Sequence, residues 1–264
     1  MNKVYVCFPG GKFKVLTMSY DDGKQEDRRL VEIFNRHGIK GTFHVNSGIK
    51  DEIRIPMEEY RKLYQGHEVA CHTLTHPTIA RCPLTEVVDE VLEDRKKLEA
   101  LMGVPIRGLS YPNGSYSEEI KKFLPALGIK YSRIVGDSHG FALPEDLYEW
   151  LPTCHHNHQL LEDGKAFVEL QKKQYLYMMY VWGHSYEFTR DDNWNVIEEF
   201  CEMVGGRDDI WYATNIEYVD YMEMSRGLQF AADNTFVYNP YVKSVWLSVN
   251  GEIREVKGGE LARL

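Results

Sequence analysis

Short apolar runs alternate along this chain with longer stretches in which apolar residues recur at helical spacing. The first run, residues 15–20, predicts a strand. Residues 25–37 predict a helix, because Leu30, Ile33 and Phe34 share one face. This alternation is typical of βα units packed around a parallel sheet.

The same alternation continues for about 225 residues, with Gly or Pro between the elements. Further strands are expected at residues 41–46, 68–73, 106–110, 130–135, 147–154, 175–182 and 210–213. Further helices are expected at residues 56–65, 84–102, 118–127, 164–173, 194–204 and 216–225. About seven or eight repeats of this kind predict an α/β fold, an irregular (β/α)7 TIM-like barrel. An open doubly wound sheet is the alternative, but no glycine-rich phosphate fingerprint follows the first strand.

The pattern changes near the end of the chain. Residues 244–249 and 252–256 alternate like strands, and Asn250-Gly251 between them supplies the positive φ angles of a tight hairpin turn. With a strand at 235–238, they predict a small C-terminal β-hairpin appendage. We therefore expect a barrel over 1–226 and the appendage over 227–264.

Composition narrows the function classes. The net charge of −9 and the absence of a basic patch argue against a nucleic-acid partner. The cysteines are odd in number and lack CxxC spacing, which argues against a disulfide framework and a thiolate zinc site. No apolar run approaches the ~20 residues of a membrane span, and the N-terminus lacks the features of a signal peptide. We therefore expect a cytoplasmic protein with no membrane partner.

Polar residues follow several of the predicted strands. Asp21-Asp22-Gly23 ends the first strand, where a simple turn before a helix is the alternative explanation. His72 and His76 follow the third strand, and two imidazoles four residues apart can grip one metal if the segment turns into a helix. Zinc at catalytic sites often takes two His and one carboxylate, which Asp21-Asp22 could supply.

Two later strands end in the same way. Residues 110–114 (Ser-Tyr-Pro-Asn-Gly) follow the fourth strand, and His184 follows the apolar run that ends at Trp182. Each segment alone is explained by a turn or by a packed histidine. A barrel, however, collects the carboxyl ends of its strands on one face, so the four segments together predict an active site there.

In this order, the motifs Ser19-Tyr20-Asp21-Asp22-Gly23, His72-Thr73-Leu74-Thr75-His76, Tyr111-Pro112-Asn113-Gly114 and His184 resemble those of the polysaccharide deacetylases, carbohydrate esterase family 4 with its NodB-homology domain. The resemblance covers residues 15–213. It implies a distorted (β/α) barrel and a metal-dependent hydrolase that removes N-acetyl or O-acetyl groups from a carbohydrate, acting on an acetylated mono- or oligosaccharide.

The resemblance also implies a role for each matching residue. Asp21 corresponds to the catalytic base and His184 to the general acid. Three residues correspond to the ligands of one divalent metal ion, zinc first, with cobalt and nickel as alternatives: Asp22, His72 and His76. Three further residues would contact the substrate or its oxyanion: Tyr111, Asn113 through its backbone N–H, and Trp182.

The chain departs from the family pattern at two points. Ser110 stands where the family has an Arg that pairs with the base, so either another cation, Arg107 or Arg133, tunes the base or the base is less well oriented. The family's fourth motif, an Asp-plus-Trp element, is absent between residues 130 and 158, where Glu149-Trp150 is only a loose substitute.

Other hypotheses about the function remain open. An amidohydrolase acting on a small non-sugar amide is the second hydrolase hypothesis, and a catalytically inert carbohydrate-binding relative is the third. The histidine-rich segment 155–158 could hold a second metal or contact the substrate, but a solvated or partly packed loop cluster is favoured. The sequence leaves the oligomeric state open.

Overall fold

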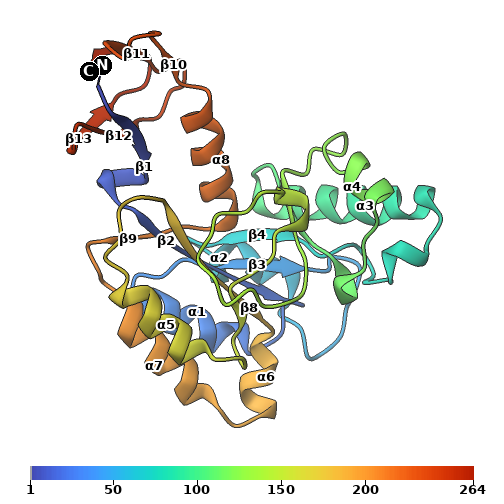
Figure 1. The fold of residues 1–264 in the computed structure, drawn as a ribbon. Helices are drawn as coiled ribbons and strands as arrows, with labels where there is room; N and C mark the ends of the chain where they lie inside the picture. Colours follow the sequence, from blue (N-terminus) through green and yellow to red (C-terminus); the bar gives the residue numbers. More distant parts are fainter. Residues whose placement is uncertain (1) are drawn as a thin grey trace.

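A computed structural model describes residues 2–264 as a curled parallel sheet flanked by helices, with a small β appendage at one end (Figure 1). The sheet strands are β2 (Lys14–Asp21), β3 (Thr42–Val45), β4 (Glu68–Cys71), β5 (Gly108–Ser110), β6 (Tyr131–Arg133), β7 (Cys154–His155), β8 (Tyr177–Gly183) and β9 (Ile210–Tyr212). They are hydrogen-bonded in the order β6-β5-β4-β3-β2-β8-β7, and β9 pairs with the first half of β2. A parallel bridge between Arg133 and Trp150 draws the chain before β7 against β6. The predicted α/β fold, an irregular barrel, is confirmed.

Most helices flank the sheet, and the last one lies between the sheet and the appendage (Figure 1). The helices are α1 (Asp27–Arg36), α2 (Tyr60–Leu63), α3 (Leu84–Met102), α4 (Glu118–Phe123), α5 (Leu160–Glu169), α6 (Ser185–Arg190), α7 (Trp194–Val204) and α8 (Asn215–Arg226). Their ends follow local chemistry. α3 starts after Pro83 and stops at Gly103, whose φ of 71° is the left-handed cap that glycine favours.

The central strand β2 determines where the site can form. All eight of its residues are buried, so both of its faces are covered. Tyr20 packs against aromatic rings of the flanking helices, Phe34 and Phe188 among them. Ser19 and Asp21 face the barrel interior, where Ser19 accepts a hydrogen bond from the Tyr180 hydroxyl (3.1 Å). Because side chains alternate along a strand, Thr17 lines the inside of the barrel with Ser19 and Asp21. Leu16, Met18 and Tyr20 lie on the opposite face and pack in the core toward the helices.

The appendage consists of two three-stranded antiparallel sheets. Its strands are β1 (Val4–Cys7), β10 (Gln229–Phe230), β11 (Phe236–Tyr238), β12 (Val245–Val249), β13 (Glu252–Val256) and β14 (Leu261–Arg263), in the orders β1-β12-β13 and β10-β11-β14. The predicted β12–β13 hairpin turns at Asn250 (φ 53°) and Gly251 (φ 93°). The N-terminal strand β1 completes the first sheet, so the two chain ends lie close together (Figure 1).

Three local predictions were wrong. Residues 147–154 form a short 3-10 turn (Leu147–Glu149) and only the two-residue strand β7, because Pro152 in this stretch lacks an N–H for a strand ladder. α5 begins at Leu160, before the predicted start at Gly164, which lies inside the helix at a close contact with Phe200 of α7. The six-residue helix α6 was not expected, since it is too short to show a helical period.

Two other findings concern the cysteines and the helix lengths. All five cysteines are free thiols. Among the helices described over residues 2–264, none is both long and apolar enough to cross a membrane.

At Gly183, β8 packs closely against the segment that follows β7. A larger side chain at this position should therefore destabilise the protein. A Cβ at this position would fall 1.9 Å from Nδ1 of the buried His156 ring. We expect Gly183→Ala to lower the free energy of unfolding by about 2 kcal/mol through overpacking, measured by urea denaturation. The control is Gly140→Ala, where the nearest atom would be 3.7 Å away. Equal stability of the two variants would contradict the close packing.

Candidate active site

The two adjacent aspartates at the end of β2 point in different directions. Asp21 is the last strand residue and is buried, with 3 % of its surface exposed. Asp22 follows with a φ of 80°, and Gly23 with a φ of 61°, so the chain turns sharply there. A left-handed conformation is uncommon for a residue other than glycine and is typical of functional turns. The turn gives the two carboxylates different surroundings.

Asp22 meets the two histidines of the loop after β4. One donor atom from each of Asp22, His72 and His76 lies within 4.8 Å of the others. The sequence analysis considered a helical turn that would place His72 and His76 on one side, but the loop is not helical. Thr73 and His76 both adopt left-handed conformations (φ 62° and 63°), and this tight loop brings the two imidazole rings to a centroid distance of 4.7 Å.

The surroundings of His72 fit a metal ligand. Its Nδ1–H donates to the carbonyl of Ser110 (2.9 Å), which leaves the lone pair of Nε2 free on the side of the aspartates. Its backbone N–H donates to Asp94 Oδ2 (3.1 Å), which fixes the strand end. A carboxylate and two imidazoles, one already in the ligating tautomer, form a donor set that suits a divalent metal such as zinc.

Asp21 is surrounded by cationic and hydrogen-bonding groups. Its Oδ2 forms an ion pair with the Arg133 guanidinium, and its Oδ1 accepts from the Ser110 hydroxyl (3.2 Å). His44 Nδ1 lies 3.4 Å from Oδ1. Burial alone would raise the pKa of Asp21, but the charge of Arg133, with smaller effects from His72 and His44, holds this pKa well below its usual value. Asp21 is therefore an ionised carboxylate able to accept a proton.

Of the two cations that could replace the family's arginine, the structure selects Arg133. Arg107 forms a bidentate pair with Asp220 on the outside of the barrel (2.7 and 2.8 Å). Arg133 is 1 % exposed and stacks on the Trp182 ring, with its guanidinium carbon 4.4 Å from the ring centroid. Trp182 is fixed in turn by a hydrogen bond from its Nε1 to the Gly136 carbonyl (3.2 Å).

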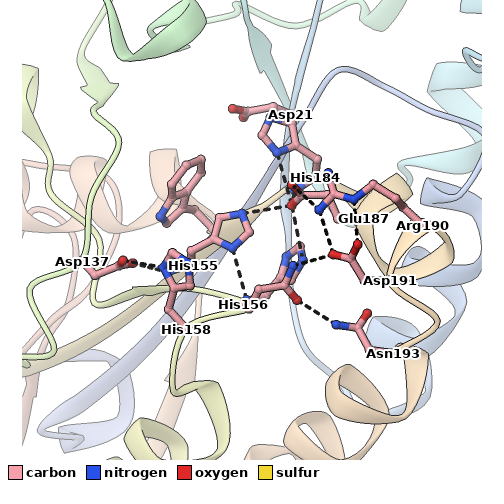
Figure 2. Close-up of polar contacts among 12 residues, drawn as sticks. Asp21, Asp137, His155, His156, His158, His184, Glu187, Arg190, Asp191 and Asn193 are labelled. Atoms are coloured by element: carbon pink, nitrogen blue, oxygen red, sulfur yellow. Dashed lines mark hydrogen bonds and ion pairs between the residues drawn. The ribbon is translucent and has the colours of Figure 1, made fainter.

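His184 lies at the N-terminus of α6 and contacts a carboxylate of the same helix (Figure 2). Its Nδ1 is 3.4 Å from Glu187 Oε2, and its backbone N–H donates to the same oxygen (3.3 Å). Burial would lower the pKa of His184, but the neighbouring Glu187 carboxylate and the charge of Asp21 raise it above its ordinary value. A higher pKa favours the protonated ring, the form that a general acid requires.

The third motif forms a turn at the rim of the site. Tyr111 is buried, donates its hydroxyl to the Tyr148 carbonyl (2.9 Å) and stacks on Tyr116. Its hydroxyl is thus engaged in holding the loop. Asn113 is exposed with a φ of 57°, and its side chain donates to Thr78 Oγ1 (3.2 Å).

Sequence reasoning missed two groups near the base and the acid. His44 belongs to β3 and lies opposite Asp21 in the strand register, so a histidine inside an apolar strand was the available signal. Glu187 was hidden because α6 was not expected. The loose substitute for the fourth motif, Glu149-Trp150, supplies no group to the site, since Trp150 packs in the barrel core and Glu149 pairs with Lys121.

The fold and site define an α/β barrel protein with a candidate metal centre at its strand ends, and comparisons with known proteins agree. A family model described as polysaccharide deacetylase matches residues 9–132. The chain is 30% identical over 107 residues to a chitooligosaccharide deacetylase of Sinorhizobium fredii, a match that covers 39% of this chain and 48% of that relative. The similarity to the polysaccharide deacetylase family therefore lies in residues 9–132.

Solved structures support the fold. A protein from Mycobacterium smegmatis, described as a putative polysaccharide deacetylase, superposes with a TM-score of 0.64 at 15% identity, covering 86% of this chain and 96% of that one. A family 4 pseudoenzyme from Bacillus anthracis superposes with a TM-score of 0.50 at 17% identity, covering 82% of this chain and 68% of that one. At such identities the similarity shows a shared architecture alone. The matched segment spans about half the length of the curated relative in Sinorhizobium.

The buried ion pair between Asp21 and Arg133 generates a prediction. Arg133→Met would leave Asp21 as an uncompensated buried charge, and we expect a loss of about 3–5 kcal/mol in the free energy of unfolding at neutral pH. Chemical denaturation measures this loss. The matched control is Arg107→Met, which breaks a half-exposed pair and should cost less than about 1 kcal/mol. An Arg133→Met protein as stable as the control would show that the pair is not a structural requirement.

Proposed function

We propose that the chain is a metal-dependent hydrolase that removes N-acetyl, or alternatively O-acetyl, groups from a carbohydrate. The observation that carries this proposal is the placement of an ionised carboxylate, Asp21, directly beside a three-residue ligand set, Asp22, His72 and His76. Relatives described as chitooligosaccharide, chitin and peptidoglycan N-acetylglucosamine deacetylases support an acetylated saccharide as substrate.

The ligand set would hold one divalent ion, zinc first, with cobalt or nickel as alternatives. Such an ion supplies Lewis acidity toward an acetyl carbonyl and toward a bound water. The work of Asp21 is to accept the proton of the attacking water at a carboxylate oxygen. Arg133 and Ser110 hold that carboxylate in one orientation and keep it charged until the proton arrives.

The remaining residues complete the reaction. His184, kept protonated by Glu187, would donate its proton to the departing amine or alkoxide. The backbone N–H of Asn113 would donate to the oxyanion, where a fixed donor stabilises the charge that develops in the transition state. Trp182 and Tyr111 would flank the sugar near the reacting group.

The two other functions make different predictions. An amidohydrolase acting on a small non-sugar amide would use the same residues, and the choice of substrate separates it from the proposal. An inert carbohydrate-binding relative would bind sugar without releasing acetate, and the presence of both Asp21 and His184 favours an enzyme over this reading. The cytoplasmic location stays a prediction.

The base assignment yields a first functional prediction. Asp21→Asn keeps the size of the side chain but removes its ability to accept a proton, so acetate release from acetylated chitooligosaccharides should fall by at least about 100-fold. The metal content of the variant, measured by elemental analysis, should match that of the unaltered protein. Retained activity would assign the base to another residue.

Metal dependence yields a second functional prediction. Removal of metal by a chelator should abolish acetate release, and zinc or cobalt should restore it. His76→Gln should release one equivalent of metal per chain together with the activity, whereas His37→Gln, on the outside of the barrel, should change neither. Undiminished acetate release from a protein verified to be metal-free would refute the proposal.

A further inference from the structure

A second cluster of metal-ligating side chains lies between the end of β7 and the start of α6. His155, His156 and Glu187 each offer a donor atom, and these atoms lie within 4.8 Å of one another. None of the three belongs to the candidate metal centre of Asp22, His72 and His76. Figure 2 shows the cluster, with Glu187 facing the two imidazoles.

The distances within the cluster match those between ligands of a single ion. Glu187 Oε2 is 3.0 Å from His155 Nε2 and 3.4 Å from His156 Nε2. Two ligands bound tetrahedrally at about 2.0–2.1 Å from zinc are about 3.3 Å apart. Two imidazoles and one carboxylate also form the donor set of many zinc sites with an open position.

The buried, unpaired ring of His156 is the feature that indicates a bound ligand. Its side chain is completely buried, and neither ring nitrogen has a hydrogen-bond partner among the described residues. The ring is held between Tyr20 (centroid distance 5.7 Å) and Phe188 (4.1 Å), which aims Nε2 at Glu187. An unpaired buried polar group is costly, and an ion bound at Nε2 would satisfy that nitrogen.

A surface pocket borders the cluster. A pocket of about 160 Å³ is lined by His156, by Asn157 and Gln159 of the following loop, and by Asn193 before α7. In Figure 2, Asp21 is drawn above His156 and Asn193 below it. The residues that line this pocket include none of the first ligand set.

We propose that His155, His156 and Glu187 form a second metal site, which takes a divalent transition-metal ion such as zinc. His155 Nδ1 accepts a hydrogen bond from the Asn157 N–H (3.2 Å), which leaves the proton on Nε2. Loading of the ion therefore moves this proton to Nδ1 and opens the contact with the exposed Asn157 loop. The site shares no residue with the first ligand set, and its Glu187 also contacts His184, so an ion bound there would compete with His184 for this carboxylate.

The test counts the ions bound to metal-free protein after dialysis against zinc and removal of the excess. The unaltered chain should retain two equivalents, and His156→Phe, which preserves the aromatic packing, should retain one. His158→Ala is the matched control, because His158 is exposed and pairs with Asp137 instead, and this variant should retain two.

Two further variants keep the test decisive. Glu187→Gln should also lose one equivalent, which covers the case in which His156→Phe does not fold. His76→Gln should lose the ion of the first site and keep the second, so failure of one site is distinguished from failure of the other. The proposal is overturned if the unaltered chain retains a single equivalent that His76→Gln abolishes, or if folded His156→Phe and Glu187→Gln both retain two.

Discussion

The buried ion pair between Asp21 and Arg133 is the constraint on which the site depends. Two adjacent carboxylates at the end of one strand would compete for the same ion if their surroundings were alike. Arg133, Ser110 and His44 anchor Asp21 inside the barrel, and the left-handed turn at Asp22 directs the second carboxylate to the histidines. The pair thus separates a proton acceptor from a metal ligand.

This constraint extends into the fold. Arg133 is the last residue of β6 and reaches across the barrel interior to Asp21 at the end of β2, so the pair joins two strands that are not neighbours in the sheet. The ring of Trp182, near the end of β8, stacks on the guanidinium of Arg133. Because a buried charge without its partner is costly, the curl of the sheet and the geometry of the site stabilise each other.

The sequence predicted the long, strongly periodic elements well, and it predicted less about groups that meet only in space. α3 was expected at 84–102 and lies there, because its ends are marked by Pro83 and Gly103. The proximity of Asp22, His72 and His76 followed from their positions at strand ends. The choice between Arg107 and Arg133 could not be made, since it depends on which strand closes the barrel. The contact of Glu187 with the site and the burial of His155 and His156 were not predicted, because α6 and β7 are too short to show a periodic pattern.

The division of roles between the two aspartates is tested most directly by diffraction from zinc-soaked crystals, recorded on both sides of the zinc absorption edge. The account predicts an anomalous peak within bonding distance of Asp22, His72 and His76, with Asp21 still paired to Arg133 and outside the coordination sphere. No peak at these three residues, or a zinc ion bound by Asp21 with Arg133 displaced, would contradict it.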